Sequence, residues 1–134
     1  MTVNELARHA GVTPHTVRYY ARIGLLTPTR SKRNGYQQFT EADVRRVSFI
    51  RRSQSLGFTL SDIAEIFRKS RHRETPCPLV RDIIRQRIEE NGAVLDELVE
   101  LRDRMKRALR KWQRLPDAVP KGDEICHLIE SIDP

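Results

Sequence analysis

Residues 12–20 of the chain read VTPHTVRYY, a pattern that begins a short helix. Thr13 offers a hydroxyl for the N-cap, and Pro14 follows at the first helical position, where its missing N–H costs nothing. Apolar side chains recur at helical spacing as far as Arg22, and Gly24 marks the end of the pattern. The residues expected on the inner face of this helix are Val17, Tyr20 and Ala21.

A second helix is predicted directly before it. Residues 3–10, VNELARHA, also carry apolar side chains at helical spacing, and Gly11 is a natural C-cap. Two short helices joined by a tight turn at residues 10–12 have the spacing of a helix-turn-helix. We therefore expect this motif in the first residues of the chain.

Residues 25–39 are expected to form a hairpin after these two helices. Asn34-Gly35 is a strong turn signal because both residues tolerate a positive φ. It is flanked by LL at residues 25–26 and by YQQF at residues 36–39. The tip is cationic, so the hairpin is predicted to be a wing that lies along a phosphate backbone.

Two further helices follow the hairpin. Thr40 caps one that runs from Glu41 to about Ser55, and Thr59 caps a shorter one after Gly57. The residues assigned to the interior are Val44, Val47, Phe49, Ile50 and Leu56 in the first helix and Leu60, Ile63, Ile66 and Phe67 in the second.

The longest predicted helix begins at Pro78, and no proline interrupts it before Trp112. A helix of about 35 residues is about 50 Å long. The apolar stripe along it is therefore too long to be buried against the small N-terminal head. The stripe is a heptad seam, and a seam of this length predicts a homodimer. Its nine positions, seven of them apolar, are Ile84, Ile88, Asn91, Leu95, Leu98, Arg102, Met105, Leu109 and Trp112.

Charge is distributed unevenly along the 134 residues. Residues 1–73 contain 14 Lys/Arg and 5 Asp/Glu, a net charge of +9, whereas residues 74–134 contain 11 and 13, a net charge of −2. A basic first half indicates a head that binds a polyanion. No apolar run reaches the roughly 20 residues that cross a bilayer, and the N-terminus has no secretory pattern, so we expect a cytoplasmic protein without a membrane partner. Its two cysteines are then expected to be free thiols or ligands.

These blocks together resemble the MerR family of transcription regulators. The matching segments are residues 12–20 with 24–26, Arg30 with residues 34–36 and 39–40, and residues 56–60 with Ile63, followed by the seam helix. These segments cover nearly the whole chain in the family's order. A helix-turn-helix alone would be weak evidence for the family, whereas four matching blocks at these intervals are strong evidence. Many relatives carry arginine after the Asn-Gly-Tyr where this chain has Gln37, which puts one expected phosphate contact in doubt.

The resemblance implies a mainly α fold. A winged helix-turn-helix head with a short β-hairpin wing, residues 1–73, would be the DNA-binding domain. A long C-terminal helix, residues 76–115, would form an antiparallel coiled-coil dimer. Residues 116–134 would form an effector-binding loop and a short C-terminal helix.

The resemblance also implies which residues contact double-stranded DNA. On the second helix, in the major groove, these are Thr13, His15, Thr16, Arg18 and Tyr19, with Tyr20 packed inward and its hydroxyl on a phosphate. Arg18 can reach a guanine edge or a phosphate. In the wing, the residues that would hold the flanking backbone are Arg30, Lys32, Arg33, Asn34, Gly35 and Tyr36.

A mechanism and partners come with the same resemblance. The homodimer would bind a pseudo-palindrome in a promoter with an overlong spacer, and the effector would make it bend and untwist the DNA for RNA polymerase. The sequence contains no nucleophile–base set, phosphate loop or metallohydrolase spacing, so we do not expect an enzyme.

Cys77 and Cys126 lie where metal-sensing members carry cysteines, one opening the dimerisation helix and the other in the C-terminal loop of the second protomer. Thiolates suit soft or borderline divalent ions, with Zn(II) as the first candidate and Cd(II), Hg(II) and Pb(II) as the others. Relatives usually carry two cysteines in the loop and this chain carries one. The resemblance therefore makes Asp117 and His127 the candidate supplementary ligands, ahead of His72 and Glu124.

Other interpretations of the two cysteines stay open. A reversible disulfide between Cys77 and the partner's Cys126 would make a sensor of oxidants or electrophiles. Small buried cysteines without a ligand role are also common. A small organic effector is disfavoured, because the roughly 20 residues after the seam are too few for a pocket of drug size.

Overall fold

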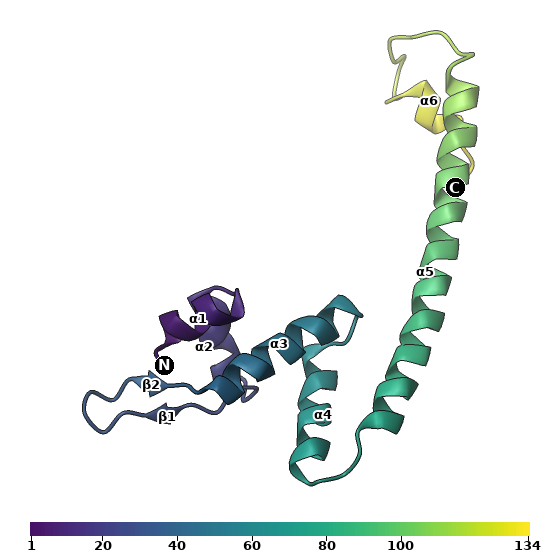
Figure 1. Cartoon of the computed structure of the whole chain (residues 1–134). Coiled ribbons are helices and arrows are strands. Elements are labelled where there is room, and N and C mark those ends of the chain that lie inside the picture. The colour runs from purple at the N-terminus through teal and green to yellow at the C-terminus, as the bar shows by residue number, and fades with distance from the viewer. The chain divides into compact units, whose positions relative to one another are not determined.

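The computed structural model describes residues 1–134 and consists of six helices and one two-stranded hairpin (Figure 1). In chain order these are α1 (Val3–Ala10), α2 (Pro14–Arg22), β1 (Thr29–Arg30), β2 (Gln37–Gln38), α3 (Glu41–Ser55), α4 (Leu60–Arg71), α5 (Cys77–Trp112) and α6 (His127–Glu130). The predicted mainly α fold with a hairpin wing and a long C-terminal helix is confirmed. No helix has both the length and the hydropathy required to span a bilayer.

The helix-turn-helix begins and ends where the sequence predicts. Gly11 is the C-cap of α1 and has a φ of 70°, a conformation that glycine adopts without strain. The Thr13 hydroxyl accepts the backbone N–H of Thr16 at 3.1 Å, and Pro14 occupies the first position of α2. Local capping chemistry therefore fixes this turn.

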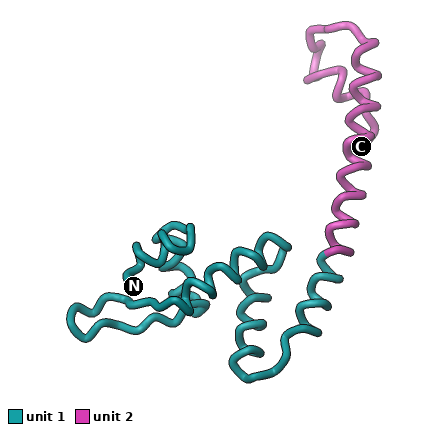
Figure 2. Tube along the Cα trace, in the orientation of Figure 1, with its two compact units in different colours: residues 1–87 teal, residues 88–134 magenta.

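One apolar core holds α1 to α4 and the start of α5 together. Its fully buried side chains include Leu6, Val17, Leu26, Val47, Ile50 and Ile63. Ile83 of α5 joins this core at 8% exposure. The structure accordingly divides into a unit of residues 1–87 and a unit of residues 88–134, with the boundary inside α5 (Figure 2). The first turns of the long helix thus belong to the head.

The wing is shorter than the sequence indicates. Thr29 pairs with Gln38 and Arg30 with Gln37, and residues 31–36 form the loop between them. Gly35 has a φ of 72°, but Asn34 does not have a positive φ, so this is not a two-residue turn. The Asn34 carboxamide instead accepts the N–H of Tyr36 at 3.0 Å. The LL pair at residues 25–26 lies in the core instead of extending the hairpin.

The prediction that Leu56 lies in the interior is wrong. Leu56 follows the last turn of α3 and is 63% exposed, whereas Phe58 is buried. Gly57 between them has a φ of 87°, and this reversal of the chain turns Phe58 into the core. Phe49, also predicted as interior, is only partly covered, by the ring of Phe67 at 5.4 Å.

The part of α5 beyond residue 87 presents a row of exposed apolar side chains. Each is more than half exposed: Ile88, Leu95, Leu98, Met105 and Leu109. These are five of the predicted seam positions, and nothing in their own unit covers them. A contiguous exposed apolar stripe of this kind marks an interaction surface.

Candidate functional site

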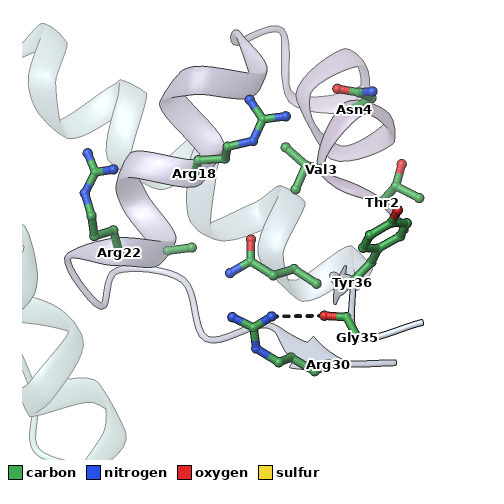
Figure 3. Close-up of a pocket in the computed structure, with 10 residues that line it drawn as sticks. Thr2, Val3, Asn4, Arg18, Arg22, Arg30, Gly35 and Tyr36 are labelled. Atoms are coloured by element: carbon green, nitrogen blue, oxygen red, sulfur yellow. Dashed lines mark hydrogen bonds between the residues drawn. The ribbon is translucent and has the colours of Figure 1, made fainter. Parts of the chain in front are cut away.

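A hollow of about 850 Å³ opens between the N-terminus of α1, one face of α2 and the wing (Figure 3). All of its walls belong to the unit of residues 1–87. We call it the head groove. Its lining residues are Thr2, Val3, Asn4, Arg18, Ala21, Arg22, Arg30, Gly35, Tyr36 and Gln37.

The head groove is built to attract an anion. Arg18 and Arg22 come from successive turns of α2 and Arg30 comes from β1, and no carboxylate is among the lining residues (Figure 3). The wall formed by Thr2, Val3 and Asn4 is the N-terminus of α1, where the Glu5 carboxylate already accepts the backbone N–H of Thr2 at 3.3 Å. The attraction for an anion therefore comes from the three arginines, whose guanidinium groups are the side chains with which proteins commonly bind phosphates.

The three arginines are held differently. Arg30 donates from Nη1 to the carbonyl oxygen of Gly35 at 2.9 Å and so closes the wing loop. The guanidinium of Arg22 lies 5.3 Å from the centre of the Tyr19 ring. Arg18 is exposed and has no hydrogen bond or ion pair within the chain. Its guanidinium is therefore free to bind a ligand.

The other residues predicted on α2 divide into exposed and inward-facing ones. His15 is exposed and Tyr19 is partly exposed. The hydroxyls of Thr13 and Thr16 lie 2.9 Å apart, so each is already bonded before any DNA arrives. Tyr20 packs inward as predicted: it is 5% exposed, burial raises the pKa of its hydroxyl, and that hydroxyl donates to Gln54 Oε1 at 3.4 Å. The Tyr20 phosphate contact stays a prediction.

In the wing, Gly35, Tyr36 and Arg30 line the head groove, whereas Lys32, Arg33 and Asn34 are exposed on the loop and do not. Sequence reasoning missed Arg22 and the α1 wall with Asn4. Arg22 could have been found, because it follows Arg18 by four residues and so shares its face of the helix. The α1 wall could not, since only the folded chain brings it beside the wing.

The predicted metal ligands are not assembled within one chain. Both cysteines are free thiols, Cys77 exposed and Cys126 half-buried, and they belong to different units. No group of three or more His, Cys, Asp or Glu side chains is close enough to hold an ion. The set of Cys77, Asp117, Cys126 and His127 therefore stays a prediction, in which the family resemblance draws Cys77 and Cys126 from different protomers.

Hydrogen bonds close the C-terminal loop onto the end of α5. Trp112 donates from its indole N–H to the carbonyl of Leu128 at 2.7 Å, and Lys111 donates to that of Ser131 at 2.7 Å. The Glu130 carboxylate accepts the N–H of Cys126 at 3.2 Å. His127 Nε2 lies 3.0 Å from the carbonyl oxygen of Pro116. The backbone around Cys126 is thus fixed, and His127 has only its second ring nitrogen unengaged.

Comparisons with known proteins agree with this architecture. The family described as MerR HTH family regulatory protein matches residues 1–70, and the one described as MerR, DNA binding matches residues 44–108. A mercuric resistance operon regulatory protein from Bacillus cereus is 31% identical over 132 residues, 97% of this chain and 95% of that protein. The HTH-type transcriptional regulator ZntR from Escherichia coli is 32% identical over 136 residues, 98% and 91% of the two chains.

A solved structure of a transcription regulator matches the fold over nearly the whole chain. The chain matches a transcription regulator from Ralstonia metallidurans, crystallised in complex with lead(II), with a TM-score of 0.71 and 29% identity over 98% of both chains. All three relatives are described as regulators and not as enzymes. The chain therefore belongs to the MerR family of helix-turn-helix regulators and is a DNA-binding transcriptional regulator.

Proposed function

We propose that the chain regulates a promoter as a homodimer whose signal is a soft or borderline divalent metal ion. The observation that carries the DNA-binding part is the head groove, where Arg18, Arg22 and Arg30 line one hollow without a carboxylate. In this proposal α2 lies in the major groove, with Arg18 on a guanine edge or a phosphate. The wing then holds the flanking backbone and positions the head without reading sequence.

The test of DNA binding begins with a duplex selected from a random pool by the full-length protein. Its affinity is then measured by fluorescence anisotropy at several salt concentrations. We expect the logarithm of the binding constant to fall linearly with the logarithm of salt concentration, because phosphate contacts release counterions. Affinity that does not depend on salt would contradict the proposed phosphate contacts.

The dimer is supported by the exposed seam and by the order of charges along α5. Residues 89–100 contain five Asp/Glu and no Lys/Arg, whereas residues 101–114 contain seven Lys/Arg and one Asp. Parallel pairing of two copies in register would set like charges side by side. Antiparallel pairing sets the acidic block of one copy against the basic block of the other, so the charges favour antiparallel pairing along the apolar seam.

The metal is supported by the relatives and by the state of the thiols. The Bacillus cereus relative is a mercuric resistance regulator, and the Ralstonia metallidurans relative was crystallised with lead(II). Cys77 is exposed at the start of α5, and Cys126 precedes α6 on a fixed backbone. Two thiolates suit soft ions, and the ion would be held by Cys77 and the partner's Cys126. Once bound, it would cross-link the two protomers.

In the mechanism we propose, this cross-link changes the geometry of the two heads. The dimer, already on a promoter with an overlong spacer, then bends and untwists the DNA so that RNA polymerase can engage it. Asp117 and His127 are the candidate supplementary ligands. His127 would need its remaining ring nitrogen, because Nε2 faces Pro116.

The test of the metal is a titration of reduced protein with Zn(II), Cd(II), Hg(II) and Pb(II). Tight binding is expected in the wild type and its loss in both Cys77→Ser and Cys126→Ser. Asp123→Asn, an exposed change in the same loop at a residue outside the candidate ligand set, is the matched control and should bind like the wild type. Affinity no tighter than about micromolar, 8 kcal/mol, would remove the metal proposal.

That negative result would favour the second candidate, a thiol switch. Both cysteines are free and at least partly accessible. Oxidation by a peroxide would join Cys77 to the partner's Cys126 as a disulfide, with two electrons and two protons passing to the peroxide, which leaves as water. A peroxide-dependent covalent dimer on non-reducing gels, absent from either serine variant, would support this switch.

A further inference from the structure

A salt bridge ties the third turn of α5 to the first turn of α4. Arg87 Nη2 lies 2.7 Å from Asp62 Oδ2, and the two side chains are only 21% and 18% exposed. The same Asp62 oxygen accepts the backbone N–H of Thr59 at 2.8 Å, within the capping box that begins α4. The carboxylate is therefore already anchored to the backbone where Arg87 meets it.

Other ion pairs on these two helices are of a different kind. Arg85 pairs with Asp82 within one turn of α5, where the side chains are 70% and 72% exposed, and Arg68 pairs with Glu65 within α4. Exposed pairs of this sort contribute little stability. The Asp62–Arg87 pair joins two helices and is shielded from water, so separating its charges is costly.

Arg87 continues the face by which α5 contacts the head. Leu79, Ile83 and Arg87 follow one another at intervals of four residues and so lie on one side of the helix. Ile83 is in the core and Leu79 packs against it. Residues 88–107 are exposed. Arg87 is thus the last residue of α5 that belongs to the unit of residues 1–87.

We propose that the Asp62–Arg87 pair is a positioning device that fixes the direction in which α5 leaves the head. The apolar contacts of Leu79 and Ile83 are non-directional and do not by themselves select one direction of the helix. The charge-assisted hydrogen bond from Arg87 to the anchored carboxylate of Asp62 forms only when α5 points in one direction from the head. In a dimer this direction sets the separation and orientation of the two heads. The inference rests on the proposed dimeric DNA binding. It names the residues that set the spacing of the two heads to the spacing of the two operator half-sites.

The experiment compares two duplexes, a full operator with two half-sites, obtained by selection, and a single half-site. Arg87→Met in the full-length protein keeps most of the side-chain length and removes the charge. Its affinity for the half-site should equal that of the wild type. Its affinity for the full operator should fall roughly 5- to 150-fold, the usual range for coupling between two sites. Arg87→Lys, which restores the charge, should recover part of this loss.

Arg85→Met is the matched control, because it breaks an exposed pair on the same helix, and it should change neither affinity. Equal losses on both duplexes, or no loss on either, would overturn the inference. Thermal melting reports whether Arg87→Met folds. If it does not, Asp62→Asn is measured instead, because its carboxamide can still accept the Thr59 N–H. This variant must lose affinity for the full operator and keep wild-type affinity for the half-site. Failure of the proposed function looks different: the wild type would sediment as a monomer or bind neither duplex.

Discussion

The arginines of the head groove contribute unequally, because their existing partners differ. Arg30 already closes the wing loop on Gly35, and Arg22 already lies over the ring of Tyr19. Arg18 has no partner to give up. A phosphate or base contact by Arg18 therefore costs only the desolvation and ordering of one side chain.

Arg18→Ala should weaken operator binding by roughly 1–3 kcal/mol without lowering the melting temperature. Fluorescence anisotropy at fixed salt measures the loss. Arg8→Ala is the matched control, since Arg8 is an exposed arginine in the last turn of α1 that does not line the groove. Equal affinity of the Arg18 and Arg8 variants would remove Arg18 from the interface.

Tyr20→Phe separates a core role from a DNA contact. The hydroxyl bonds to Gln54 at 3.4 Å, a long bond, so its loss should cost at most about 1 kcal/mol of unfolding free energy. The predicted phosphate contact requires a loss of operator affinity in this variant, and unchanged affinity would leave the hydroxyl with its core role alone. Because burial raises the pKa of Tyr20 above 10.0, the wild type should lose stability as the pH rises through that raised value. Urea unfolding at increasing alkaline pH should show a smaller loss for the phenylalanine variant.

At the scale of elements, α5 has two roles along its length. Its first turns pack on the head through Ile83 and Arg87, and the remainder presents an apolar seam to the solvent. One continuous helix therefore joins the surface that contacts the head to the surface that we propose contacts a partner.

Leu98→Glu should dissociate the dimer, because it places two carboxylates near the middle of the seam. Each buried leucine lost from an apolar interface costs about 2–5 kcal/mol. Sedimentation equilibrium at micromolar concentration should show monomers. Glu97→Gln, on the same turn but outside the seam, should remain a dimer. A dimeric Leu98→Glu protein would contradict the assignment of the seam.

The elements predicted best are those specified by local chemistry. Thr13 and Pro14, Thr40, and Thr59 each begin a helix where the sequence indicates, because a cap acts within one turn. The wing was predicted less well, since two consecutive leucines, Leu25 and Leu26, are equally compatible with a strand of the hairpin and with a buried segment of the core. Leu56 was assigned to the interior wrongly, and the buried Phe58 was not assigned, because Gly57 reverses the chain between them.

At the scale of the whole molecule, the missing information is what a second chain contributes. The head groove lies within one protomer, and four of its ten lining residues, Arg18, Arg30, Gly35 and Tyr36, were predicted from the sequence. The proposed thiol site is untested within one chain, because Cys77 and Cys126 lie in separate units. The sequence pointed to the two cysteines, and to Asp117 and His127 as supplementary ligands, only through family resemblance.

The most direct measurement of the central claim, a metal site shared between protomers, is complementation between the two serine variants. Cys77→Ser and Cys126→Ser homodimers each lack one thiolate from every site. Dimers formed by co-expressing both variants would regain one complete site, made of Cys77 from one protomer and Cys126 from the other. We predict that Cd(II), followed by its thiolate charge-transfer absorbance, binds tightly to the mixed dimers and to neither parent. Mixed dimers that bind no better than the parents would contradict the shared site.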